Sequence, residues 1–304
     1  MSKYLLASPD RYGRFGHQTT SISAALILAH LTNSKLIAPR YMYFCDKWNK
    51  YSDFSRSKNV ASAIDEKTVV YYLEKELVDQ HGNRKWDLTD KDQIADIISK
   101  IHIASDNTII HLPFDQSAGL LLRLLNKKEI RDDFRSIFLF PDQRITPLFP
   151  YACVHIRRGD CTRNAHPLWY VEDSFYIQLL QLLFSTLPIE YKVYVCTQGD
   201  ISWLNTSELS HVLTSQRLII RSTDQLFIND SEIDDFIIMK NASFLFSAAS
   251  SFSHWASYLG CHHLVVDISR SGLHALNNTL IVNPDDSVIE NMSKINNAID
   301  LLQV

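Results

Sequence analysis

The fold of this chain is decided by one stretch, Val154-His155-Ile156-Arg157-Arg158-Gly159-Asp160. An apolar run over residues 151–156 leads into it and predicts a buried strand, and Gly159 predicts the turn that follows. Because side chains alternate between the two faces of a strand, His155 and Arg157 are expected to share one face. Arg158 is expected on the opposite face, unless the strand has already ended.

The charged residues of this stretch need partners, since a His, two Arg and an Asp are costly to bury alone. The planar fork of arginine matches the oxygens of phosphate, and open α/β sheets bind ligands at the carboxyl ends of their strands. The stretch therefore predicts a site for an anion, in particular a diphosphate. An Arg–Asp pair that only fixes the turn would explain the same residues. An adhesion tripeptide at Arg158-Gly159-Asp160 is disfavoured, because a bare tripeptide is unspecific and this one continues a core strand.

The composition is that of an ordinary globular protein with room for one large or two medium domains. The chain has 304 residues, of which 46% are hydrophobic and 21% charged. A net charge of −4 without a basic block argues against nucleic acid as a partner. There is no signal-peptide pattern and no apolar run of about 18 residues, so we expect a cytoplasmic protein without a transmembrane segment. Peripheral association with a membrane stays open.

The five cysteines are scattered, and none belongs to a Cys-x-x-Cys pair. This spacing indicates neither a disulfide framework nor a zinc site. Cys153 and Cys196 lie in strand-like apolar runs, so we interpret them as small core residues.

The N-terminal half begins with a predicted strand at residues 4–7 and a predicted helix at residues 19–31. The loop between them contains Gly13-Arg14-Phe15-Gly16-His17-Gln18. A strand, a glycine loop and a helix in this order allow backbone N–H groups to approach an anion at the helix start. A plain turn between strand and helix is the simpler explanation of the two glycines, since the third glycine of a dinucleotide motif is missing.

Two further N-terminal patterns each have a structural and a functional interpretation. Residues 40–60 are rich in aromatic side chains, which predict a packing cluster under a long loop in preference to a wall that stacks on sugars. Asp90 and Asp92 precede a predicted helix and are explained by capping and by the helix dipole. The same two carboxylates would serve a metal-dependent sugar transferase as metal ligands. The aromatic residues are Tyr41, Tyr43, Phe44, Trp48, Tyr51 and Phe54.

The second half alternates strands and helices, which predicts a parallel α/β sheet in each half of the chain. A proline-rich segment at residues 141–150 marks the expected boundary between domains 1–147 and 148–304. An amphipathic helix at residues 287–302 is expected to end the chain and could brace the N-terminal domain.

A second anion-binding candidate is Ser250-Ser251-Phe252-Ser253, which begins a predicted helix directly after a strand. Hydroxyls together with unpaired backbone N–H groups make a phosphate site at a helix start, although capping alone needs only one serine. Asp234 and Asp235 open another predicted helix and are either a dipole pair or carboxylates that bind a base edge.

Taken together, these motifs resemble those of the bacterial α-1,2-fucosyltransferases within the GDP-fucose transferase superfamily. The resemblance spans roughly residues 4–264 and rests on motifs of the form G-x-x-G-N-Q, H-x-R-R-G-D, D-D-x-x-x-M and N-S-S-F-S-W-W. A D-I-x-W motif after a strand is similar as well. The corresponding stretches here are 13–18, 155–160, 234–239, 249–255 and 200–203.

The resemblance implies a GT-B fold, in which two Rossmann-like domains with parallel sheets face each other across a cleft. It implies an inverting, metal-independent transfer from GDP-fucose to a hydroxyl of a glycan acceptor, with the glycine loop on the acceptor side. Arg157 and Arg158 would bind the diphosphate, with His155 ordering them. The donor-binding residues would be Gly13, Gly16, Asp234, Asp235, Ser250, Ser251 and Ser253.

The sequence departs from the family motifs in four places, and the first two remove amides from positions near the donor. His17 and Ala249 stand where the family has Asn, His254 stands where it has Trp, and Gln198-Gly199 replaces Ser-Asp. A GDP-sugar related to fucose, such as GDP-colitose, therefore stays open, as do a different nucleotide sugar and a catalytically inactive nucleotide- or glycan-binding module.

The transfer needs a general base for the acceptor hydroxyl. The sequence offers three candidates without ranking them, namely His17, His166 and Asp160.

Overall fold

The structure, a computed structural model, divides into two compact units, Met1–Phe140 and Pro141–Val304, and each is described here by itself. The expected domain boundary between residues 147 and 148 falls outside the described residues. Those residues are 3–7, 15–41, 43–62, 69–72, 90–112, 119–140, 149–199, 201–223, 231–270, 276 and 279–302.

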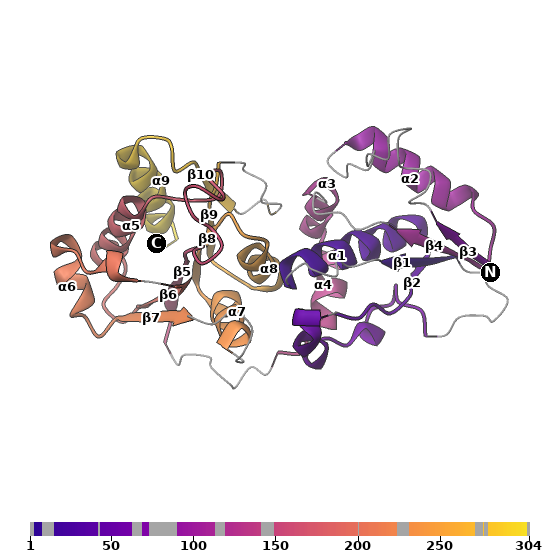
Figure 1. Cartoon of the computed structure of the whole chain (residues 1–304), viewed down its shortest axis with the longest axis horizontal. Helices are drawn as coiled ribbons and strands as arrows, with labels where there is room; N and C mark the ends of the chain where they lie inside the picture. The colour runs from indigo at the N-terminus through magenta and orange to yellow at the C-terminus, as the bar shows by residue number, and fades with distance from the viewer. Residues whose placement is uncertain are drawn as a thin grey trace. The chain divides into compact units, whose positions relative to one another are not determined.

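The first unit is built on a parallel four-stranded sheet in the order β2-β1-β4-β3 (Figure 1). Its strands are β1 (Tyr4–Ala7), β2 (Lys35–Leu36), β3 (Val69–Tyr72) and β4 (Thr108–Leu112). Its α-helices are α1 (Phe15–Thr32), α2 (Lys91–Ile103), α3 (Gly119–Leu122) and α4 (Lys128–Ile137). The 3₁₀ helices are η1 (Tyr43–Tyr51), η2 (Phe54–Arg56) and η4 (Arg123–Asn126).

Helix α1 begins four residues earlier than the sequence predicts, so Gly16 and His17 belong to its first turn. It is also buried on nearly all sides. Its many small residues allow neighbours to approach on every side. The hydroxyls remain satisfied because they donate to the helix backbone, as in Thr19 to the Phe15 carbonyl at 2.6 Å and Ser23 to the Thr19 carbonyl at 2.5 Å.

The aromatic segment at residues 40–60 is a packing cluster, as predicted. The side chains of Tyr41, Trp48 and Tyr51 are buried, and the ring of Trp48 stacks on Phe15 at a centroid distance of 3.7 Å. This contact fixes the first turn of α1 against the loop.

Asp90 has its predicted capping role at the start of α2, since its carboxylate accepts from the backbone N–H of Asp92 at 2.8 Å.

The second unit is built on a parallel six-stranded sheet in the order β10-β9-β8-β5-β6-β7. Numbered within the unit, this is 6-5-4-1-2-3, the doubly wound order of dinucleotide-binding folds. The strands are β5 (Tyr151–His155), β6 (Lys192–Gln198), β7 (Leu218–Thr223), β8 (Phe244–Ala248), β9 (Leu264–Ile268) and β10 (Thr279–Val282). The helices are α5 (Asp173–Thr186), η5 (Ser202–Leu204), η6 (Ser207–Leu209), α6 (Ser210–Leu213), α7 (Ser231–Asn241), α8 (Ser251–Leu259) and α9 (Val288–Asp300).

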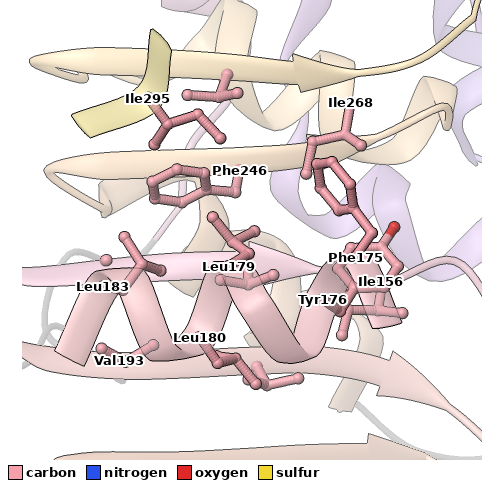
Figure 2. Packing of buried hydrophobic residues seen from close by; sticks show 14 of the residues in the cluster. Ile156, Phe175, Tyr176, Leu179, Leu180, Leu183, Val193, Phe246, Ile268 and Ile295 are labelled. Atoms are coloured by element: carbon pink, nitrogen blue, oxygen red, sulfur yellow. The ribbon is translucent and has the colours of Figure 1, made fainter. Parts of the chain in front are cut away.

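Helices cover both faces of this sheet: α5 and α9 pack together on one face, and α7 and α8 pack together on the other (Figure 1). The core under α5 is apolar, and Figure 2 shows Leu179 and Leu183 of α5 beside Phe246 of β8, with Ile295 of α9 completing the layer. The alternate residues of β5, Cys153 and His155, therefore belong to the face that α7 and α8 cover.

The predicted α/β class is confirmed: both units are Rossmann-like, and both sheets are parallel. The terminal helix is also present, as α9, and it packs against α5, β9 and β10 of its own unit. Within the part of the chain that the structure describes, no helix is both long enough and apolar enough to cross a membrane.

Candidate active site

The candidate site lies at the switch point of the second sheet, between β5 and β8. From β5 the chain continues to β6 on one side, and after β7 it crosses over to β8 on the other. Loops that leave neighbouring strands in opposite directions open a crevice at the carboxyl ends, where doubly wound sheets bind ligands. Here β5 ends at His155 and β8 ends at Ala248, so the two motifs singled out in the sequence meet at this edge.

Arg157 bridges the two strand ends. Its Nη1 donates to the carbonyl oxygen of Ala249 at 2.9 Å, and its Nη2 lies 3.6 Å from the Asp160 carboxylate. The guanidinium carbon lies 4.7 Å from the ring centroid of Trp169, whose side chain is exposed. These contacts hold the fork at the switch point, and the side chain keeps 19% of its surface exposed.

Arg158 has a different environment on the opposite side of the strand end. Its guanidinium donates to Asp173 at 2.5 Å and to the Val171 carbonyl at 2.9 Å. The rings of Tyr170, Tyr176 and Trp203 surround it at centroid distances of 4.5 to 5.7 Å. The structure thus favours Arg157 over Arg158 as the group that meets a ligand, and the diphosphate role of both stays a prediction.

His155 is held as a neutral imidazole. Burial is the main cause that lowers its pKa to about 3, and the positive charges of Arg157 and His254 lower it further. Its Nδ1 is buried, and among the described residues it has no hydrogen-bond partner. A neutral ring can accept or donate one hydrogen bond, so this nitrogen is available to order a neighbour or to contact the ligand.

The serine motif combines a cap with a packing contact. Ser250 is the N-cap of α8, where its hydroxyl accepts from the N–H of Phe252 at 3.3 Å. Ser253 is fully buried, and its hydroxyl accepts from Ser247 at 2.8 Å and donates to the Ala248 carbonyl at 3.3 Å. This environment favours a packing role for Ser253, and its contact with the donor stays a prediction. Contact with the donor stays a prediction for Ser250 and Ser251 as well.

The two carboxylates of α7 are also distinct. Asp235 is buried and pairs with Nε of Arg221 on β7 at 2.5 Å. Burial raises its pKa to about 6, although the Arg221 hydrogen bond acts in the opposite direction. Asp234 has a buried Oδ1 that, among the described residues, has no hydrogen-bond partner. Asp234 is therefore better placed than Asp235 to accept from a ligand.

Two of the three base candidates lie on the loop after β5. Asp160 is next to Arg157, and the ring of His166 stacks on Trp169 at 4.7 Å, so Trp169 joins His166 to the arginine. His17 is half-buried in the first turn of α1, in the other unit. Of the remaining predicted positions, Gly16 is buried in that same turn, and Gly13 and Asp200 lie outside the described residues.

A cavity of about 430 Å³ opens beside the motif on the β6 side. Gly159 and Gly199 both line it and both have a φ of +75°, a backbone conformation that favours glycine. A Cβ on Gly159 would come within 2.8 Å of the Gln198 side-chain oxygen. The glycine of the motif thus allows the loops after β5 and β6 to meet closely. Arg158, Thr162, Asn164 and Tyr170 complete most of the remaining lining.

The loop after β5 is clamped by residues far away in sequence. Arg270 forms two hydrogen bonds to the carboxylate of Asp285, at 2.6 and 2.7 Å, and donates to the Tyr170 carbonyl at 2.6 Å. Held from this side and by Arg158 from the other, the loop keeps Trp169 over Arg157. Such a supporting shell is what preorganises a binding site.

Three residues of the site region were not singled out from sequence: Trp169, Arg221 and Asp267. Trp169 follows a proline in a loop and offers no periodic signal. Arg221 and Asp267 each sit at the polar end of an apolar strand, as His155 does, and that shared position was the signal available in the sequence.

A GT-B glycosyltransferase consists of two Rossmann-like units, and this chain has two such units, the second with polar motifs meeting at its switch point. Residues 148–271 match the family model described as Glycosyl transferase family 11, the family of the α-1,2-fucosyltransferases. This part of the chain is similar to that family, and the protein is a glycosyltransferase. The match contains the H-x-R-R-G-D stretch, α7 and the serine motif.

Solved structures similar to this chain include two heptosyltransferases of E. coli. ADP-heptose LPS heptosyltransferase II has a TM-score of 0.48 and 11% identity, with 100% of both chains covered. Heptosyltransferase WaaC with ADP has a TM-score of 0.43 and 9% identity, with 99% of each chain covered. The lipopolysaccharide outer core galactosyltransferase WaaB has a TM-score of 0.37 and 10% identity, covering 99% of this chain and 90% of its own. No curated protein sequence matches this chain.

Proposed function

We propose that the protein transfers a fucose-type sugar from a GDP-sugar to a hydroxyl of a glycan acceptor, with inversion at the anomeric carbon and without a metal ion. The observation that carries the proposal is the position of Arg157. Its guanidinium lies at the switch point of the doubly wound sheet, bonded across to Ala249 at the start of the serine motif. Both motifs lie within the part of the chain that matches family 11.

The chemistry needs a stabiliser for the leaving diphosphate. As the bond from the sugar C1 to the phosphate oxygen breaks, its electron pair and negative charge move onto the diphosphate. The fixed guanidinium of Arg157 and the N–H groups at the start of α8 would stabilise this charge without moving, which is the condition for effective electrostatic catalysis. Neutral His155 beside them adds no competing charge and can order the arginine.

The preference for guanine rests on Asp234. A carboxylate oxygen that is buried and has no partner within the described residues is costly, and a ligand N–H would remove this cost. Guanine presents two such donors, N1–H and the exocyclic amine, on one edge, whereas uracil does not. We therefore expect calorimetry to show tighter binding of GDP than of UDP, and a weaker preference after Asp234→Asn.

The acceptor hydroxyl gives its proton to a base as its oxygen bonds to C1. Asp160 and His166 lie beside Arg157 on the loop after β5, and His17 is the candidate from the first unit. Single replacements by Asn or Gln separate the three, because loss of the base lowers kcat by about 10² to 10⁴ and leaves donor binding intact.

The test is a panel of GDP-, UDP- and ADP-sugars incubated with the protein, with hydrolysis and transfer to simple glycosides measured in parallel. We expect turnover of GDP-fucose or a close relative that persists in EDTA, and an α-linked product from the β-linked donor by NMR. Arg157→Lys is the matched variant, and we expect it to lose most of this turnover. Turnover that EDTA abolishes would favour metal-dependent transfer involving Asp90 and Asp92. Tight GDP binding without turnover of any donor would favour the inactive binding module.

A further inference from the structure

A layer of polar side chains lies between the sheet and the first turn of α8. The strand register pairs Ser247 of β8 with Asp267 of β9. Val154 of β5 pairs with Phe246 of β8, so the next residue, His155, lies at the level of Ser247. Ser253 and His254 of α8 meet this layer, Ser253 through Ser247 and His254 through Asp267. The switch point is therefore lined by polar groups from three neighbouring strands and one helix.

Asp267 is the charged centre of this layer. It is fully buried, and its Oδ1 lies 3.1 Å from Nε2 of His254, while Oδ2 accepts from the Ser269 hydroxyl at 2.9 Å. A buried carboxylate is costly without a hydrogen-bonding or oppositely charged partner, and His254 is the basic side chain at ion-pair distance from it. Because a carboxylate only accepts, Nε2 carries a proton, and this contact fixes the orientation of the ring.

His254 lies between this buried centre and the solvent. Its side chain is 16% exposed, whereas that of Asp267 is completely buried. Its charge also contributes to the lowered pKa of His155, which places the two rings within electrostatic reach of each other. Arg157 reaches the same helix start from the sheet side, through the Ala249 carbonyl. His254 and Arg157 thus both lie at the start of α8.

We propose that His254, oriented by Asp267, is a second cationic donor to the leaving diphosphate and complements Arg157. The proposal rests on the proposed function. His254 keeps its own proton and only hydrogen-bonds the phosphate oxygen that receives the electron pair, while the acceptor proton goes to the separate base. The fucosyltransferase motif that residues 249–255 resemble has Trp at this position, so the resemblance does not assign the role.

The test uses His254→Gln, because the glutamine amide can keep the N–H contact with Asp267 but carries no charge. GDP carries on its terminal phosphate the charge that a GDP-sugar develops only as it reacts, and GMP lacks that phosphate. We expect the variant to bind GDP about tenfold more weakly or worse, and GMP within about twofold of wild type, as for a lost hydrogen bond to a charged group. In turnover, kcat falls by about 10² while KM for the donor changes less.

The matched control is His262→Gln. His262 lies beyond the other end of α8 and bonds to the Ala242 and Ala256 carbonyls, so its loss should leave GDP and GMP affinity unchanged. Asp267→Asn is the second variant: it is expected to weaken GDP binding in the same direction as His254→Gln. Urea unfolding of each variant separates lost packing from lost binding.

Two outcomes would overturn the inference. If His254→Gln binds GDP and turns over donor like wild type, the dyad only anchors α8 to β9. If both nucleotides weaken equally, the effect is a general loss of structure. The proposed function is tested separately: it is wrong if the wild-type protein turns over no donor. In that case, the comparison of GDP and GMP binding still decides whether His254 contacts the terminal phosphate. A wild-type protein that binds GDP no better than GMP would overturn both proposals.

Discussion

Arg157 and Arg158 are adjacent and identical side chains at the end of β5, but their environments differ. On the β8 side, Arg157 donates to the Ala249 carbonyl, lies near the Asp160 carboxylate and stays partly exposed beside an exposed tryptophan. On the β6 side, Arg158 is enclosed by three aromatic rings and paired with Asp173. One arginine is therefore placed to meet a ligand, and the other to hold the loop.

The difference shows that two consecutive arginines can have different roles, because neighbouring side chains at a strand end point to opposite sides. The loop after β5 needs an internal cation to connect it to the start of α5, and Arg158 supplies it through Asp173. Only with that loop fixed can Trp169 remain over Arg157. Under the proposed function, the two consecutive arginines therefore have different roles: Arg158 holds the loop and Arg157 binds the diphosphate.

The largest expected effect is that of Arg157→Lys on catalysis. Lysine keeps the charge but loses the fork, so we expect kcat to fall by about 10² to 10³, the scale of one lost donor to the developing charge. Stability should change by less than about 1 kcal/mol, because the side chain is partly exposed. Steady-state kinetics and urea unfolding on the same preparation measure both. Near-normal activity of a folded variant would contradict the assignment.

The same substitution at the neighbouring position should act on stability. Arg158→Lys loses the forked contacts with Asp173 and the Val171 carbonyl, and we expect a decrease of about 2 to 3 kcal/mol in unfolding free energy. Activity of the folded fraction should fall by less than roughly tenfold. Asp173→Asn serves as the matched variant from the other partner. A large loss of kcat at unchanged stability would show that Arg158 acts in catalysis as Arg157 does, and the two arginines would then not differ in role.

The pH dependence of stability tests the environment of His155, whose pKa the charge of Arg157 helps to lower. Its pKa lies near 3 in the folded protein against an ordinary value of 6.5, so the unfolded chain binds a proton at pH values where the folded chain does not. The stability that this group contributes is present above pH 6.5 and is lost as pH falls towards 3. Between pH 7 and pH 5, wild type should lose about 2 kcal/mol more than His155→Gln. Parallel pH profiles of the two proteins in urea unfolding would show that His155 titrates normally.

The smallest effect is expected for Ser253→Ala. Its buried hydroxyl bonds to Ser247 and the Ala248 carbonyl, so removal should lower the unfolding free energy by about 1 kcal/mol and leave GDP affinity unchanged. Ser250→Ala is the companion variant, and loss of its cap should cost about 1 kcal/mol as well. A GDP titration and a melting curve distinguish the roles. If Ser253→Ala bound GDP more weakly while its stability stayed unchanged, the Ser253 hydroxyl would contact the nucleotide.

Much of the fold could be predicted because local patterns define it. The strand at residues 151–156 and the helix at Asp173–Thr186 follow from apolar periodicity, and Gly159 follows from the need for a positive φ at the turn. The apolar runs at residues 244–246 and 264–266 predict two short strands, and β8 and β9 each run two residues further. Their polar ends are satisfied by neighbours across the sheet and by α8. Helix α4 was not predicted, although Ile130, Phe134 and Ile137 repeat at helical spacing.

The sequence by itself determined that an α/β chain carries a cationic motif at a strand end and hydroxyls at a later helix start. Both signals are local, since strand alternation and helix capping act over a few residues. Only the tertiary structure decided which arginine is enclosed, which serine is buried and that His254 meets Asp267. Those outcomes depend on parallel register and on helices packed from elsewhere in the chain, and a buried polar group is satisfied only by the neighbours that packing brings to it.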